Sequence, residues 1–249
     1  MNSRRLRWLP GALSSVGAGL LLPVLFPSDL GFAGLCVLLA LQEILLLGLP
    51  ALLAMRRSPA SAQELQGLWG KPTAYQSGLG MLAAVSFTLV GVLITVVFVA
   101  ALQSFGFGIP EGAALVPEGP GQLAAAILCV TLIPAAAEEL LFRGLIQGAL
   151  AKRFSGKAAV WVSAILFALL HRSVLAFPQI LAIGLVLGVL RVRSGGLVLP
   201  IVFHAFYNFA VLVLNYTKAV PTLGMMLLCV GIFTVSFRLL NKQEVADES

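Results

Sequence analysis

Histidine, cysteine and charged residues are all scarce in this chain of 249 residues. It has two histidines and three cysteines, and 10% of its residues are charged while 59% are hydrophobic. The cysteines stand alone inside apolar runs, so they support neither a disulfide framework nor a thiolate metal site, and they are interpreted as buried small side chains: Cys36, Cys129 and Cys229. So little charge excludes an ordinary soluble domain.

The chain is instead rich in apolar runs of about twenty residues, the length at which a helix crosses a bilayer. Mean hydropathy is +1.01. These runs predict an all-α fold, a polytopic helical membrane bundle in a single domain over residues 1–249. The first span is interpreted as uncleaved rather than as a signal peptide, and the 104–120 loop as a solvated connector rather than a lid. The eight predicted spans cover residues 8–27, 30–54, 79–103, 121–151, 158–172, 175–192, 197–216 and 221–240.

The basic residues follow the pattern of a membrane protein, although a net charge of +6 would also suit a nucleic-acid partner. They form small clusters between apolar runs. With eight spans and the N-terminus inside, nearly all of them fall on one side, and only Arg172 and Lys218 fall on the other. The positive-inside rule therefore predicts that both termini are cytoplasmic. We expect an integral protein of a bacterial inner membrane, with lipids rather than nucleic acid as its surroundings.

Ionisable side chains at membrane depth are functional candidates, and one predicted span carries Glu138, Glu139 and Arg143. Glu139 and Arg143 are four residues apart on one helix face, where they can form a neutral pair. Glu138 points about 100° away and has no such partner, which makes it a candidate general base or acid. A structural charge cluster and the ion path of a transporter remain alternatives. Glu43, in another span, is interpreted as structural.

The two histidines belong to two further spans. His171 follows Phe167 by four residues, and His204 precedes Asn208 by four, so each pair shares a helix face. Counted from the nearest cytoplasmic basic residues, Glu138 and both histidines lie at roughly 16–21 Å of helical rise, which is one layer near the middle of the bilayer. A shared site is therefore favoured over scattered structural polar groups.

The ordered set EExxxR, FxxxH and HxxxN resembles the CPBP family of intramembrane endopeptidases, which includes CaaX prenyl proteases and bacteriocin-processing or immunity-associated proteins. The motifs are Glu138–Arg143, Phe167–His171 and His204–Asn208, all within residues 121–216. The resemblance implies that Glu138 polarises a water molecule and that His171 helps to position or deprotonate it. It also implies that His204 and Asn208 form an oxyanion hole, while Glu139, Arg143 and Phe167 support the site.

The same residues leave other chemistry open. Glu138, His171 and His204 could hold a zinc ion with an open position for water, but no cofactor is favoured because the spacing is unlike HExxH. The expected substrate is a peptide bond near the terminus of a membrane-anchored or lipidated protein, and trimming of C-terminal anchors of exported proteins is one such role. A non-proteolytic immunity or scaffold protein and a small proton-coupled transporter are the alternative functions.

Overall fold

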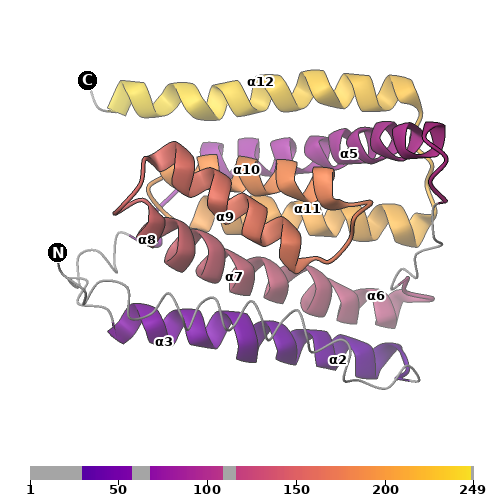
Figure 1. The fold of residues 1–249 in the computed structure, drawn as a ribbon, viewed down its shortest axis with the longest axis horizontal. Coiled ribbons are helices and arrows are strands. Elements are labelled where there is room, and N and C mark those ends of the chain that lie inside the picture. The colour runs from indigo at the N-terminus through magenta and orange to yellow at the C-terminus, as the bar shows by residue number, and fades with distance from the viewer. Residues whose placement is uncertain (1–29, 58–67, 109–115, 248–249) are drawn as a thin grey trace.

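The computed structural model describes residues 30–57, 68–108 and 116–247, and every regular element in these ranges is a helix (Figure 1). The predicted all-α class is confirmed. The first predicted span, residues 8–27, lies outside the described residues, as does Glu111 in the 104–120 loop. The count of eight spans and the cytoplasmic location of both termini therefore stay predictions.

The other seven predicted spans each correspond to a helix within a few residues. Two of these spans change between α- and π-helical geometry along their length. The elements in chain order are α2 Phe32–Gln42, η3 Glu43–Gly48, α3 Leu49–Arg57, α5 Ala74–Ser104, α6 Pro120–Ala126, η4 Ile127–Leu132, α7 Ile133–Glu139, η5 Leu140–Gln147, α8 Gly148–Leu150, α9 Gly156–Leu170, α10 Phe177–Arg193, α11 Val198–Thr217 and α12 Leu223–Asp247.

Five of the described helices are long and apolar enough to cross a membrane, which makes the chain an integral membrane protein. They are Phe32–Met55, Ala74–Ser104, Pro120–Leu150, Val198–Thr217 and Leu223–Leu240. The other two are shorter: α9 has 15 residues and α10 has 17. A 15-residue helix rises only about 22 Å, less than the hydrocarbon thickness of roughly 30 Å. The turn between α9 and α10 is therefore expected within the membrane.

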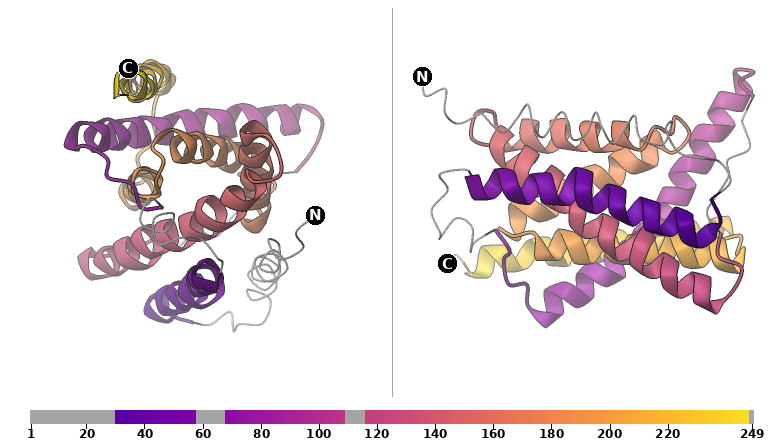
Figure 2. Two further views of the ribbon diagram at one scale, coloured as in Figure 1. Left: turned by 90° about the vertical axis from the view of Figure 1, so that its left-hand side faces the viewer. Right: turned by 90° about the horizontal axis from the view of Figure 1, so that it is seen from below.

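The helices pack side by side around α7 and α11. Seen end-on, α12 lies at one side of the bundle and α2–α3 at the other, with the remaining helices between them (Figure 2). The element α12 packs on α5, which in turn contacts α10 and α11, while η3 packs on α7 from the opposite side. The helices α9 and α10 form a closely packed pair. Within the elements that carry the three motifs, Glu138, Glu139, Arg143, Phe167 and His204 are buried, whereas α9 also carries exposed apolar side chains such as Trp161 and Leu169.

Local sequence explains where these helices begin and end. At the start of α5, the backbone N–H of Gln76 donates to Thr73 Oγ1 and the N–H of Thr73 donates to Gln76 Oε1, a capping box. The N-cap Ser155 of α9 accepts from the N–H of Ala158. That helix ends at Leu170, with His171 as its C-cap. Arg172 then adopts a left-handed conformation with φ of 54°, which turns the chain towards α10.

Candidate active site

A buried ion network centres on Glu139 of α7. Arg143 Nη1 donates to Glu139 Oε1 at 2.9 Å, and both side chains have 0% exposure, so the predicted pair is present. The other terminal nitrogen of Arg143, Nη2, donates to the backbone carbonyl of Gly184 on α10 at 2.9 Å. His204 of α11 places Nδ1 3.0 Å from the same Glu139 oxygen. One oxygen of Glu139, Oε1, thus contacts both Arg143 on its own span and His204 on α11.

Glu138 is placed differently. Its side chain is 8% exposed, and its Oε2 makes no hydrogen bond to any described residue. The nearest cationic or imidazole nitrogen is His204 Nε2, at 3.7 Å from Oε2, beyond hydrogen-bonding distance. A buried carboxylate oxygen without a partner is costly unless something else occupies the space beside it. Glu138 is therefore the glutamate available for chemistry.

His171 is held in one orientation at the end of α9. Its Nδ1 lies 2.9 Å from the carbonyl oxygen of Phe167. A carbonyl oxygen only accepts, so Nδ1 carries the hydrogen and donates it. In the neutral imidazole this leaves Nε2 as an unprotonated acceptor. The side chain is thus prepared to accept a proton or to orient a water molecule.

Phe167 packs against the charged and imidazole groups of the site. Its ring centroid lies 4.8 Å from that of His171 and 5.7 Å from that of His204. The Arg143 guanidinium carbon lies 4.5 Å from the same ring centroid, a cation–π contact. Phe167 is 1% exposed. Its side chain therefore fixes both histidines and Arg143 relative to one another by packing.

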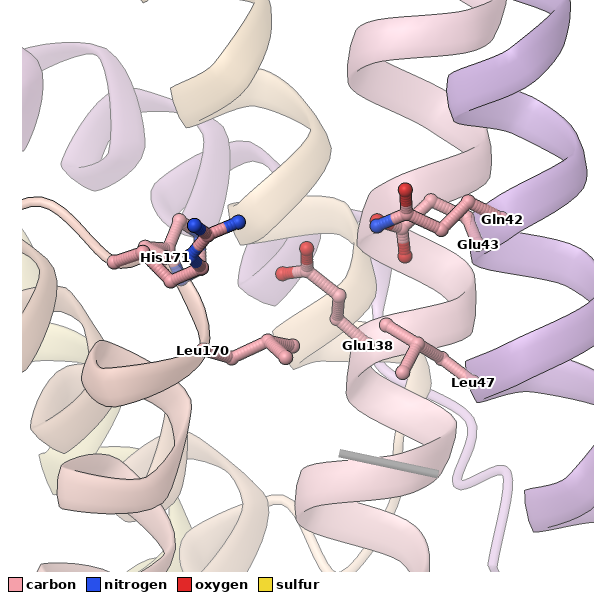
Figure 3. Close-up of a pocket in the computed structure, with 7 residues that line it drawn as sticks. Gln42, Glu43, Leu47, Glu138, Leu170 and His171 are labelled. Atoms are coloured by element: carbon pink, nitrogen blue, oxygen red, sulfur yellow. The ribbon is translucent and has the colours of Figure 1, made fainter. Parts of the chain in front are cut away.

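A pocket of about 210 Å³ opens beside Glu138 (Figure 3). The Glu138 carboxyl group points into it from α7, with His171 on one side and side chains of η3 and the end of α2 on the other. The residues that line it are Gln42, Glu43, Leu47, Glu138, Leu170, His171 and Arg172. The geometry thus brings a carboxylate and an imidazole acceptor to one small space that can admit water.

Two of the four predicted catalytic residues do not line this pocket. His204 touches the site through Glu138 and Glu139, behind the pocket wall. Asn208 lies one turn further along α11, is partly buried, and its side chain makes no hydrogen bond to a described residue. His204 and Asn208 therefore lie near one face of α11, as their four-residue spacing predicts. No hydrogen bond between described residues joins Asn208 to Glu138.

Sequence reasoning missed the wall formed by α2 and η3. Glu43, interpreted as structural, lines the pocket together with Gln42, and Arg172 lines it from the α9 side. No motif surrounds Glu43, but it is an ionisable residue within an apolar span, and that signal alone marks a candidate. The π-helical segments were also missed. One begins at Glu43 and another directly follows Glu139, and such segments are frequent at functional sites.

The zinc alternative requires Glu138, His171 and His204 to converge on one point. Among the residues that the structure describes, no three His, Cys, Asp or Glu side chains are grouped to hold a metal ion. His204 faces Glu139 with Nδ1 and Glu138 with Nε2, and His171 faces the Phe167 carbonyl with Nδ1, so each ring keeps its Nε2 on the side of Glu138 or the pocket. A catalytic zinc needs three convergent ligands.

The fold and this site define a polytopic helical membrane protein with a carboxylate–histidine centre within its bundle. Comparison with known proteins narrows that class. Residues 120–210 match the family model described as type II CAAX prenyl endopeptidase Rce1-like. This segment is similar to that family of membrane endopeptidases, and the predicted CPBP resemblance is confirmed over residues 120–210.

One relative among curated proteins matches a smaller part of the chain. An uncharacterized 24.3 kDa protein of Escherichia coli is 29% identical over 85 residues, which cover 31% of this chain and 38% of that protein. The match thus spans little more than a third of the relative's length. No solved structure matches the chain significantly.

Proposed function

We propose that this protein is an intramembrane endopeptidase in which Glu138 activates the attacking water. One observation carries the proposal: Glu138 lines a pocket that His171 also lines, whereas Glu139, which likewise has a buried oxygen without a hydrogen-bond partner among the described residues, does not line it. The neighbouring Glu139 is engaged by Arg143 and His204. Of the two adjacent glutamates, Glu138 is therefore the base and Glu139 is the support.

The hydrolytic step uses two proton acceptors at the pocket. A water molecule between Glu138 and His171 Nε2 gives a proton to Glu138 as its oxygen attacks the peptide carbonyl carbon. His171 accepts the second water hydrogen in a hydrogen bond, and this aims the oxygen lone pair at the carbon. The Nδ1–H bond to the Phe167 carbonyl supports this role, because it keeps Nε2 free as the acceptor.

The negative charge that develops on the carbonyl oxygen needs a donor, and His204 is the best placed imidazole. Glu139 holds Nδ1 and so turns Nε2 towards Glu138. A protonated His204 donates from both nitrogens, and together with Arg143 it balances the charges of Glu138 and Glu139. Its Nε2–H and the Asn208 amide then act as the oxyanion hole in the assembled complex with substrate.

The substrate proposed is a membrane-anchored or lipidated protein that is cut near its terminus. The matched family is described as type II CAAX prenyl endopeptidase, and a pocket within the membrane-spanning part of the chain suits a bond that the bilayer delivers. Trimming of the C-terminal anchors of exported proteins in a bacterial inner membrane is the specific role we favour. An immunity or scaffold function and proton-coupled transport are the competing outcomes of the test.

The test is cleavage of lipidated and membrane-anchored peptides by the purified protein in lipid nanodiscs. Wild type is compared with Glu138→Gln, His171→Ala and His204→Ala, with Glu118→Gln as a control at an exposed glutamate. Each of the first three variants is expected to lose activity by about 10²–10⁴-fold, the usual contribution of general acid–base or oxyanion groups. Equal cleavage by all variants would exclude this assignment. Activity that survives a chelator argues further against zinc.

A further inference from the structure

Glu43 contributes a second carboxyl group to the pocket, and it lies outside the segment that matches the family. It stands within the apolar span Phe32–Met55, where it is the first residue of the π-helical segment η3. Its Oε2 is buried and has no hydrogen-bond partner among the described residues. A carboxyl group kept at this depth without a partner is expensive, which argues for a role in the chemistry next to it.

Glu43 and Glu138 face the same pocket from different walls (Figure 3). The other charged or titratable groups that line this pocket are His171 and Arg172, both from the end of α9. On η5 and α7, which also pack against η3, Arg143 and Glu139 are paired with each other. Two ionised carboxylates that share about 210 Å³ would repel each other strongly, so one of the two is expected to hold a proton.

The charged neighbours of Glu43 and Glu138 decide which of the two carboxyl groups holds the proton. With His204 protonated, as proposed above, its Nε2 lies 3.7 Å from Glu138 Oε2 and stabilises an ionised Glu138. Among the described residues, Glu43 has no basic nitrogen within 4.0 Å, the limit for an ion pair. Protonation of Glu43 therefore costs less free energy than protonation of Glu138. A protonated carboxyl group that lines the pocket can donate a hydrogen bond into it.

We infer that Glu43 is the general acid of the reaction, which protonates the leaving amine while Glu138 deprotonates the water. This inference rests on the proposed peptidase function. In the cleavage step the carbon–nitrogen bond breaks and its electron pair stays on nitrogen, which takes the proton of the Glu43 carboxyl group. Glu43 becomes a carboxylate, and Glu138 carries the proton taken from water. Transfer of that proton across the pocket to Glu43, through a water molecule, restores both groups.

A matched pair of substrates tests this role, because an amine leaves only after protonation whereas an alcohol leaves far more readily without it. The same lipidated peptide is prepared with an amide or with an ester at the scissile bond. Glu43→Gln keeps the size and polarity of the side chain but cannot act as an acid. We expect it to lower kcat on the amide by about 10²–10⁴-fold and kcat on the ester by a much smaller factor.

Two further variants complete the design. Glu138→Gln removes the base and should slow both substrates, while Glu118→Gln makes the same change at an exposed glutamate and should slow neither. Equal losses on amide and ester in Glu43→Gln would overturn the inference and make Glu43 a structural or positioning group. Unchanged amide cleavage would overturn it as well.

A spectroscopic measurement separates failure of this inference from failure of the peptidase proposal. If wild type cleaves neither substrate, the peptidase function is wrong, and the protonation of Glu43 is still decided by infrared spectroscopy of the protein in nanodiscs. We expect a protonated carboxyl band near neutral pH that disappears in Glu43→Gln and persists in Glu118→Gln. A spectrum unchanged by Glu43→Gln would overturn the assignment of the proton to Glu43.

Discussion

Arg143 supplies the positive charge that balances the buried carboxylate of Glu139. It pairs with Glu139, donates to the Gly184 carbonyl and stacks on Phe167, all at 0% exposure. Removing its guanidinium leaves the Glu139 carboxylate buried with less compensation, so we expect Arg143→Ala to lower the free energy of unfolding by about 3–5 kcal/mol. Denaturant unfolding in bicelles measures this. The double variant with Glu139→Ala should be less destabilised than the sum of the two single variants, and simple additivity would contradict the coupling.

Asn208 offers the opposite case, a residue proposed for catalysis that contributes little to the fold. Its side chain is partly buried and makes no hydrogen bond to a described residue. Asn208→Ala should therefore leave the melting temperature unchanged and lower kcat by about 10²–10³-fold, the value of one oxyanion donor. Thermal unfolding and peptide cleavage on the same preparation check both parts. A stable variant with full activity would remove Asn208 from the mechanism.

At the residue scale, the spacing of residues along the sequence predicted contacts within one helix. It did not predict which side chains of different helices meet. The Glu139–Arg143 pair follows from a four-residue separation, which brings two side chains to one face. The third member, His204, lies 65 residues from Glu139 in sequence, and only the packing of α11 on α7 brings them together. Glu43 was missed for the same reason, because its place at the pocket depends on how η3 packs on α7.

At the element scale, the close packing of α9 on α10 positions both His171 and the carbonyl that binds Arg143. Gly188 permits it: a Cβ atom there would lie 2.8 Å from Val160 Cγ1 and 3.1 Å from Gln147 Oε1. Gln147 also donates to the Gly188 carbonyl at 2.9 Å. Gly188→Ala should therefore destabilise the protein by about 1–3 kcal/mol, as overpacked cores do. Gly231→Ala on α12, where a Cβ meets nothing within 4 Å, is the matched control and should not destabilise it.

The helices themselves were largely predictable, because an apolar run of membrane length has few alternatives to a helix. The span predicted at 121–151 is found at 120–150, and the span predicted at 197–216 is found at 198–217. The π-helical segments were not predictable from periodicity. Residues four apart fall near one face in α- and π-helices alike, so the sequence pattern of Glu139 and Arg143 is the same in both.

At the scale of the whole molecule, the accessible side of the pocket follows from the short α9–α10 pair. In the predicted orientation Lys157, near the start of α9, is cytoplasmic and Lys218 is on the outer side. In this orientation α9 begins and α10 ends at the cytoplasmic face. The turn that connects them, which contains the pocket residue Arg172, then lies inside the bilayer. Water should therefore reach the pocket from the outer side.

Labelling of single cysteines with a membrane-impermeant maleimide in intact cells tests this directly. The native cysteines are first replaced by alanine or serine. Val174→Cys reports on the turn, since Val174 is 73% exposed, and should react from outside like the outer control Lys218→Cys. Lys157→Cys should react only after the cells are opened. If Val174→Cys behaves like Lys157→Cys, the pocket opens to the cytoplasm, and the substrate would then reach the site as a cytoplasmic lipidated peptide rather than as the anchor of an exported protein.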